Sequence, residues 1–266
     1  MQQDMLRLVP FLLGAVGGAF FLRERRLRLG AERLGGATLE TLLEAIAAND
    51  PGTGAHVRRV ADYSLLLAEA ADLDAHTQRS IERVALFHDI GKLDSAITDI
   101  IDDARGLTPD ERRAIMRHPR MGAEVLSPLA QFYPDLPEGV LSHHERWDGT
   151  GYPRHLKGKR IPISARVVAI ADSFDAITHA RAYSHARTLK TAVEKIAAGR
   201  GGQFDPELTD LFLSPPVLES VAKSMRESHT RHSGPQRRRP AGSKAAAPDI
   251  TFRWRTATHG RLPSGR

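Results

Sequence analysis

Leu86-Phe87-His88-Asp89-Ile90-Gly91-Lys92 is the stretch of this 266-residue chain from which the rest is interpreted. The histidine offers a neutral nitrogen and the aspartate an anionic oxygen, and the two oxygens of an aspartate can bridge two metal ions. Alone, such a dipeptide is more often a solvated pair or a helix end. Here it closes an apolar segment, where an aspartate without a partner is costly to bury. A metal ion is one such partner.

Further nitrogen and oxygen donors recur along the chain, and each has an ordinary explanation. A histidine near a helix start, such as His56, usually faces solvent, and His118 before a proline is an ordinary polar residue at a helix stop. The apolar run that ends at Asp172 is different, because it is too buried for an unpaired carboxylate. Taken together, the set favours a metal site. The candidate metal ligands are His56, His88, Asp89, His118, His143, His144 and Asp172.

The order of these residues resembles the HD-GYP family of phosphohydrolases, because Trp147-Asp148-Gly149-Thr150-Gly151-Tyr152-Pro153 directly follows the double histidine. The resemblance covers about residues 50–213. It implies an HD-superfamily helical bundle with a GYP-type loop. It also implies a phosphodiesterase that opens cyclic di-GMP to linear pGpG, sometimes onward to GMP, and a loop that contacts diguanylate cyclase (GGDEF) domains.

The same resemblance implies two divalent metal ions, of which iron and manganese suit imidazole and carboxylate ligands. Asp89 would bridge them, and a water held between them would become a hydroxide that attacks phosphorus. Lys92 would contact a phosphate oxygen and offset developing charge. Asp89 and Lys92 are therefore the expected catalytic residues. One ion would be completed by His56, His88 and Asp172, and the other by His118, His143 and His144.

The composition of the loop over residues 145–162 indicates which substrate the protein binds. Glycines let backbone amides approach phosphates, aromatic rings stack on guanine, and basic groups attract anions. An ordinary basic surface loop has the same composition, so the family resemblance decides between the two. The expected substrate-binding residues are Lys92, Gly151, Tyr152, Pro153 and Arg181.

Two departures from the family pattern keep other functions open. Members with a third metal carry a glutamate where this chain has Gly52, so two ions are expected. A second basic residue usually follows the Arg-Pro-Tyr motif, whereas this chain has Ser184 after Arg181-Ala182-Tyr183. The alternatives are a phosphohydrolase acting on another nucleotide, and a module that binds cyclic di-GMP or a cyclase with little turnover. A pure binding module has no need for seven metal ligands.

The spacing of apolar residues predicts an all-α fold. Helices are expected from Thr38 to about Asn49, from a cap at Thr53, and over residues 75–88, 109–116, 163–177 and 188–197. No alternating run is long enough for a sheet. The chain has no cysteine, which excludes disulfides and thiolate metal sites and fits a reducing compartment.

The HD-GYP domain is expected over residues 38–214, between segments of different composition. Within residues 1–37, the uncharged run 8–22 precedes four arginines; it is either a membrane anchor or a disordered or amphipathic start, with the domain in the cytoplasm or on the inner face of the membrane. Residues 215–266 hold eleven Lys or Arg against three acidic residues and are predicted to be a disordered tail. This tail either binds RNA or anionic lipid, or is only solvated. The helix before Asp50 could pair with its copy in a homodimer.

Overall fold

The structure, a computed structural model, consists of helices joined by turns and loops in the parts of the chain that it describes. Within them no strand forms, and only an isolated bridge pairs Arg200 with Phe204. The all-α prediction is confirmed. The described residues are 30, 34–48, 50–93, 108–179 and 188–232.

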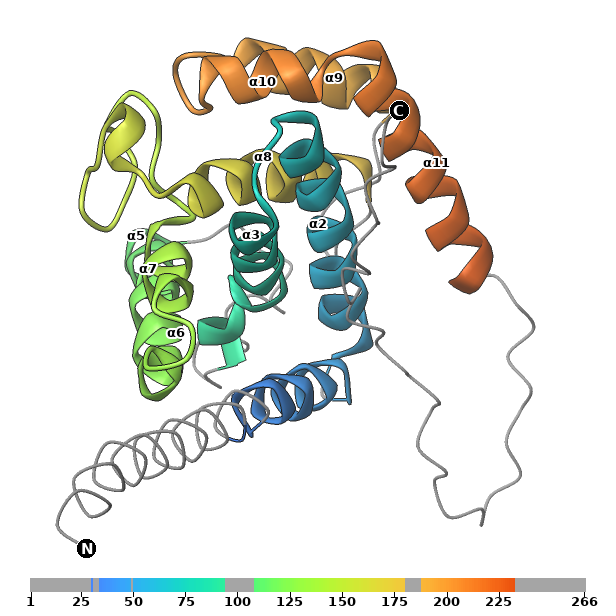
Figure 1. The fold of residues 1–266 in the computed structure, drawn as a ribbon. Coiled ribbons are helices and arrows are strands. Elements are labelled where there is room, and N and C mark those ends of the chain that lie inside the picture. Colours follow the sequence, from blue (N-terminus) through green and yellow to red (C-terminus); the bar gives the residue numbers. More distant parts are fainter. Residues whose placement is uncertain (1–29, 31–33, 49, 94–107, 180–187, 233–266) are drawn as a thin grey trace, which may run out of the picture.

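Three long helices form the centre of the molecule: α2 (Pro51–Ala70), α3 (Ala75–Phe87) and α8 (Ile163–Thr178). Each packs on the other two, and α8 crosses α2 and α3 (Figure 1). Aromatic rings fill the space between helices. The ring of Phe174 lies edge-on to Tyr63 and to Phe212, with centroid distances of 5.5 and 5.3 Å. Fully buried rings of this size contribute much of the hydrophobic stabilisation of such a core.

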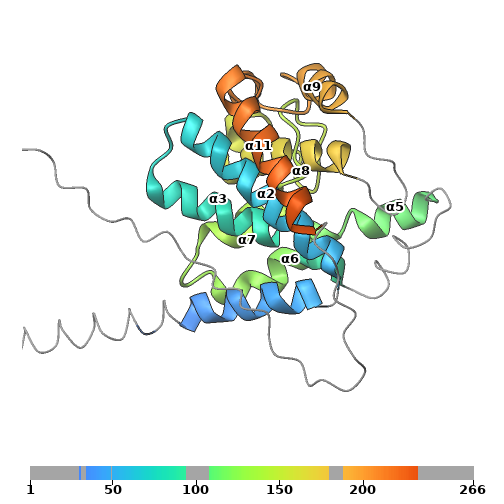
Figure 2. The same cartoon turned by 90° about the vertical axis from the view of Figure 1, so that its right-hand side faces the viewer.

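Shorter helices surround this centre. On one side, α6 (His118–Leu126) and α7 (Asp135–Ser142) pack together, with α6 against the 3₁₀ helix η1 (Ile90–Leu93) and α7 against α3. On the other side, α9 (Leu189–Ala198) and α10 (Pro206–Phe212) lie across the top in Figure 1, and α11 (Pro215–His232) runs down the right-hand side. Figure 2 shows α5 (Pro109–Ile115) projecting from the bundle, and this helix buries no residue. Two further 3₁₀ turns are η2 (Ser127–Leu129) and η3 (Gly158–Arg160).

The start of α2 differs from the prediction. The N-cap is Asp50, whose side chain accepts a hydrogen bond from the Gly52 amide at 2.8 Å, and Pro51 is the first helical residue. Thr53, predicted as the cap, lies inside the first turn, and its hydroxyl donates to Asp50. Aspartate is as good a cap as threonine, and proline is favoured directly after it. Asp50-Pro51 therefore begins the helix three residues earlier than expected.

The expectation of disorder from Pro215 onward is corrected for the first part of that segment. α11 is a helix whose Val217 and Val221 are buried in the core, and it packs on α2. The basic composition of the whole tail hid two apolar residues four apart, which is the spacing of one helix face. The rest of the tail and residues 8–22 lie outside the described residues. Among the residues that the structure describes, no helix is both long enough and apolar enough to cross a membrane.

Candidate metal centre

The His88-Asp89 pair lies where α3 ends and η1 begins, in the interior of the bundle. His88 is fully buried and Asp89 is 8% exposed. Gly91 explains why η1 can pack so closely on α6: a Cβ there would lie 2.1 Å from the carbonyl oxygen of His118. Only glycine permits this approach. It leaves Asp89 Oδ1 3.3 Å from Nε2 of His118.

A first group of ligand atoms comes from three different helices. His56 lies in the first turns of α2, His88 caps α3, and Asp172 lies within α8. Oδ1 of Asp172 is 3.3 Å from Nε2 of His56 and 3.9 Å from Nε2 of His88. These three atoms lie within 4.8 Å of one another, close enough to share one ion.

A second group lies beside the first and joins it at Asp89. It consists of Asp89, His118 at the start of α6, and His143 and His144 directly after α7. Oδ1 of Asp89 faces this group, at 3.3 Å from His118 and 3.9 Å from His143. Oδ2 faces the other way, at 3.5 Å from His88 and 4.0 Å from His56. One carboxylate therefore turns one oxygen towards each group.

Backbone carbonyls determine which nitrogen of three histidines faces the centre. Nδ1 of His88, His118 and His143 lies 2.8, 2.7 and 2.6 Å from the carbonyl oxygen three residues earlier. Since a carbonyl only accepts hydrogen bonds, Nδ1 carries the proton in each ring. The Nε2 lone pairs are then left to face the centre, which is the usual orientation of metal-binding histidines.

Several nitrogen lone pairs in the centre lack a hydrogen-bond donor, and a cation would satisfy them. Nε2 of His118 and Nε2 of His143 are 3.2 Å apart, so two lone pairs face each other. A proton on either nitrogen would require a charged ring, or an unprotonated Nδ1 against a carbonyl oxygen. Nε2 of His88 is buried without a hydrogen-bond partner, which is costly for a polar atom. The residues present therefore fit divalent metal ions.

Burial keeps the imidazoles of His88, His143 and His144 neutral. It lowers the pKa of His88, lowers that of His143 well below its ordinary value, and lowers that of His144 to about 3. For Asp89, burial alone would raise the pKa, but the ammonium of Lys92 and the neighbouring imidazoles outweigh it and hold the pKa well below its usual range. Neutral imidazoles and an ionised carboxylate are the protonation states that bind a metal.

Lys92 lies in η1, one turn beyond Asp89. Its Nζ is 2.7 Å from Oδ2 of Asp89, and its side chain is 24% exposed. Lys92 was predicted to contact a phosphate. In this structure its ammonium instead forms an ion pair with Asp89. The partly exposed ammonium lies at the edge of the centre.

His56 has a different second partner from the other histidines, and sequence reasoning missed it. Its Nδ1 is 2.7 Å from Oδ2 of Asp175, a carboxylate that also accepts from Arg59 and His179. For His56, burial would lower the pKa, but hydrogen bonds to Asp172 and Asp175 outweigh it and raise the pKa. The available signal was spacing: Asp175 follows Asp172 by three residues within one buried helix, so both carboxylates lie on one face.

The loop after His144 folds back on that residue. A Cβ at Gly151 would lie 2.3 Å from the Arg146 amide, so only glycine fits. The Tyr152 ring stacks on His144 at 4.9 Å, and the following Tyr152–Pro153 peptide is cis. The structure therefore brings Gly151 and Tyr152 beside the second group. Arg181 lies outside the described residues.

The side chains of Glu145 and Arg154 hold the loop in place through hydrogen bonds and an ion pair. Glu145 is buried and accepts hydrogen bonds from the amides of Arg154 and Leu156, at 2.7 and 2.9 Å. The guanidinium of Arg154 pairs with Glu138 and donates to Ser142 at 2.7 Å. The loop that carries the Gly-Tyr-Pro motif is thereby fastened to the end of α7.

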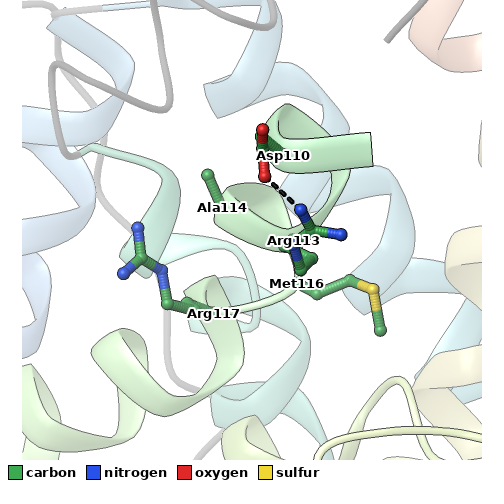
Figure 3. Close-up of a pocket in the computed structure, with 5 residues that line it drawn as sticks. All are labelled: Asp110, Arg113, Ala114, Met116 and Arg117. Atoms are coloured by element: carbon green, nitrogen blue, oxygen red, sulfur yellow. Dashed lines mark hydrogen bonds and ion pairs between the residues drawn. The ribbon is translucent and has the colours of Figure 1, made fainter. Parts of the chain in front are cut away.

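A separate hollow lies on α5 and the turn before α6 (Figure 3). It is lined by Asp110, Arg113, Ala114, Met116 and Arg117, and Arg113 pairs with Asp110. None of these side chains belongs to either ligand group. The hollow is therefore distinct from the centre, although Arg117 directly precedes His118.

Comparison with known proteins agrees with this geometry. The chain is 42% identical over 178 residues to the cyclic di-GMP phosphodiesterase response regulator RpfG of Xanthomonas campestris, covering 66% of this chain and 47% of that protein. It is 36% identical over 191 residues to a cyclic di-GMP phosphodiesterase of Thermotoga maritima, covering 70% and 50%. The chain thus spans about half the length of the curated relatives it matches.

A solved structure shares the fold. It is a cyclic GMP-AMP specific phosphodiesterase of Vibrio cholerae, with a TM-score of 0.52 and 21% identity, covering 77% of this chain and 53% of that one. The family profile described as HD domain matches residues 40–208, which is more than half of the chain. These residues contain both ligand groups and the loop that follows His144. The chain therefore belongs to the HD domain family, and the HD-GYP resemblance is confirmed.

Proposed function

We propose that this protein is a metal-dependent phosphodiesterase that hydrolyses cyclic di-GMP to linear pGpG, and onward to GMP where the linear product rebinds. The observation that carries the proposal is Asp89, whose two oxygens face two separate groups of neutral or hydrogen-bonded imidazoles. Relatives named as cyclic di-GMP phosphodiesterases support the choice of substrate. Iron or manganese suits this set of nitrogen and oxygen ligands.

The two ligand groups would hold one divalent ion each, with Asp89 shared. When bound, two such ions activate a water nucleophile and polarise the phosphoryl oxygens of a diester. His56, His88 and Asp172 would hold one ion. His118, His143 and His144 would hold the other. Because carbonyls and Asp175 fix the Nδ1 side of four of these rings, their Nε2 atoms are positioned before any ion arrives.

The other residues act on the substrate. Lys92, at the edge of the centre, would offset the negative charge that develops on the phosphate during attack. Tyr152, which stacks on His144, extends the centre with an aromatic surface suited to a purine. Gly151 lets the loop backbone approach, and Pro153 and Arg181 stay predicted contacts. No serine or cysteine nucleophile is needed in this scheme.

A cyclic dinucleotide of mixed base is the second candidate substrate. The solved structure with the same fold is named as a cyclic GMP-AMP specific phosphodiesterase. Both substrates share the two phosphodiesters and at least one guanine, so the metal centre alone does not discriminate between them. Contacts to the second base would decide which of the two dinucleotides is preferred.

The test is hydrolysis by the full chain, loaded anaerobically with Fe(II) or Mn(II), with bound metal counted on the same sample. Formation of pGpG at two ions per chain is expected, with slower turnover of 3′3′-cyclic GMP-AMP. His88→Ala should lose metal and turnover together. The matched control is His76→Ala, because His76 is exposed at the start of α3. Two bound ions without hydrolysis of either dinucleotide would refute the proposal, and no bound ion would favour a binding module.

Association with a cyclase domain, a membrane or a second copy stays a prediction. The loop tip around η3 exposes basic side chains that a GGDEF domain could contact. Attachment through residues 8–22 and nucleic-acid or lipid binding by the basic tail concern residues outside the description. The helix over residues 34–48 buries Leu39, Leu43 and Ile46 in its own chain, so a homodimer would have to use its remaining faces.

A further inference from the structure

Asp175 is a buried carboxylate beside the centre that accepts several hydrogen bonds. It lies on α8, is 1% exposed, and is surrounded by donors from three residues. Arg59 donates through Nε to Oδ1 at 2.7 Å and through Nη2 to Oδ2 at 2.9 Å. Nδ1 of His56 lies 2.7 Å from Oδ2, and Nδ1 of His179 lies 3.0 Å from Oδ1. Both oxygens are thus fully used.

The spacing of these residues forms two successive contacts between α2 and α8, called here the first and the second rung. His56 and Arg59 are three residues apart on α2, and Asp172 and Asp175 are three apart on α8, so each pair lies on one helix face. The first rung joins His56 to Asp172 and belongs to the ligand group. The second rung joins Arg59 to Asp175 and contains no ligand. His56 contacts both carboxylates, so the second rung controls the orientation of a first-rung residue.

A carboxylate partner does more for a ligand histidine than a carbonyl does. It fixes the ring and its tautomer, and it makes Nε2 a stronger donor to a metal. It can do this only if it stays ionised and in place when buried, which requires a fixed counter-charge. The guanidinium of Arg59 supplies that charge with two parallel hydrogen bonds, a geometry that a lysine cannot reproduce.

We propose that Arg59 is a positioning residue of the metal centre: it holds Asp175 in the orientation that directs Nε2 of His56 towards the ion shared with His88 and Asp172. This inference rests on the proposed function only in assuming that the two groups bind ions. Arg59 itself touches neither ion nor substrate. Its effect is confined to the group that contains His56, because two histidines of the other group, His118 and His143, are held by backbone carbonyls.

The experiment measures binding of Co(II), whose visible absorption reports its ligands, to the full chain in competition with a chelator. Wild type should bind two Co(II) per chain. Arg59→Gln should bind one of them about 10- to 100-fold more weakly, the usual effect of losing such an outer partner, and the other unchanged. Its spectrum should change for the weakened ion alone. Arg59→Lys, which keeps the charge but only one hydrogen bond, should recover part of the affinity.

Controls separate positioning from folding. Arg58→Gln removes the neighbouring guanidinium on α2, which within the described residues donates to the Gly54 carbonyl, and should leave both ions bound as in wild type. Asp175→Asn keeps the side-chain volume and should weaken the same ion as Arg59→Gln. If Arg59→Gln does not fold by circular dichroism, Arg59→Lys and Asp175→Asn carry the test.

Two outcomes would overturn the inference. One is that folded Arg59→Gln and Asp175→Asn bind both Co(II) within twofold of wild type. The other is that both ions are weakened equally, which would mean a general loss of structure. Either result leaves the proposed function standing, provided that wild type binds two Co(II). A wild-type chain that binds no Co(II) would refute the proposed function instead.

Discussion

Replacing Gly91 with alanine tests whether close packing of η1 on α6 builds the metal centre. A Cβ at this position would lie 2.1 Å from the His118 carbonyl oxygen and 2.7 Å from the Gly122 amide nitrogen, whereas real Cβ atoms essentially never come within 3.0 Å of another heavy atom. Both obstacles are backbone, so no side chain can move aside. The two segments must separate by about 0.9 Å, the difference between 3.0 and 2.1 Å. The 3.3 Å distance between Asp89 and His118 then widens.

The expected cost follows from overpacking. Forcing one extra carbon into a packed core typically destabilises a protein by about 1–3 kcal/mol. For a domain of this size, the melting temperature should fall by about 2–4 °C per kcal/mol. Gly91→Ala should also lose the ion of the second group before that of the first, because Asp89 and His118 both belong to the second.

Thermal unfolding by circular dichroism on the metal-free full chain measures the first effect, and metal content after loading measures the second. Gly36→Ala is the matched control. Its Cβ would lie 3.8 Å from the Tyr133 hydroxyl, an ordinary contact, and alanine favours the helix over residues 34–48. A Gly91→Ala protein that melts within 1 °C of wild type (an error margin on the order of 0.3 kcal/mol) and holds both ions equally would refute this account of the centre.

Three further outcomes are expected. Lys92→Ala should lower turnover of cyclic di-GMP while metal content stays at two ions; loss of metal would show that Lys92 supports Asp89 instead. Glu145→Ala should raise KM more than it lowers kcat, because it frees two loop amides without touching a ligand atom, and an unchanged KM would contradict this. Hydrogen bonds from His179, His56 and Arg59 lower the pKa of Asp175 despite its burial, so its stabilisation exists above the ordinary carboxyl pKa of 3.8 and is lost as pH falls below it. The free energy of unfolding should therefore fall more steeply with decreasing pH for wild type than for Asp175→Asn. Parallel curves would count against this stabilisation by Asp175.

Helices with apolar residues at helical spacing, or with a clear capping sequence as in α5, could be predicted from the sequence, and those that depend on packing could not. The predicted segments 75–88, 109–116, 163–177 and 188–197 correspond to α3, α5, α8 and α9 within one or two residues. α6 and α7 were not predicted. Each contains proline and glycine within nine residues, which lowers helix propensity, and each is stabilised by packing on its neighbour.

The candidate ligands followed from residue order, whereas their supporting contacts did not. The division of the ligand atoms into two groups that meet at Asp89 matches the division that the resemblance implied, and ion binding itself stays a prediction. The role of Arg59 could not be read from the sequence, because it depends on the register between α2 and α8. The function of Glu145 was equally hidden: a glutamate after two histidines resembles another ligand until its loop partners are known.

The candidate ligands are spread over five segments that are far apart in the chain, from His56 to Asp172. An ion that joins such segments acts as a cross-link, and closing long loops in the folded state disfavours the unfolded chain much as a disulfide does. This chain contains no cysteine and has no disulfide available for that purpose. Because an ion that binds only the folded form stabilises it by mass action, scarcity of metal in the cell would shorten the lifetime of the protein against proteases as well as silence it.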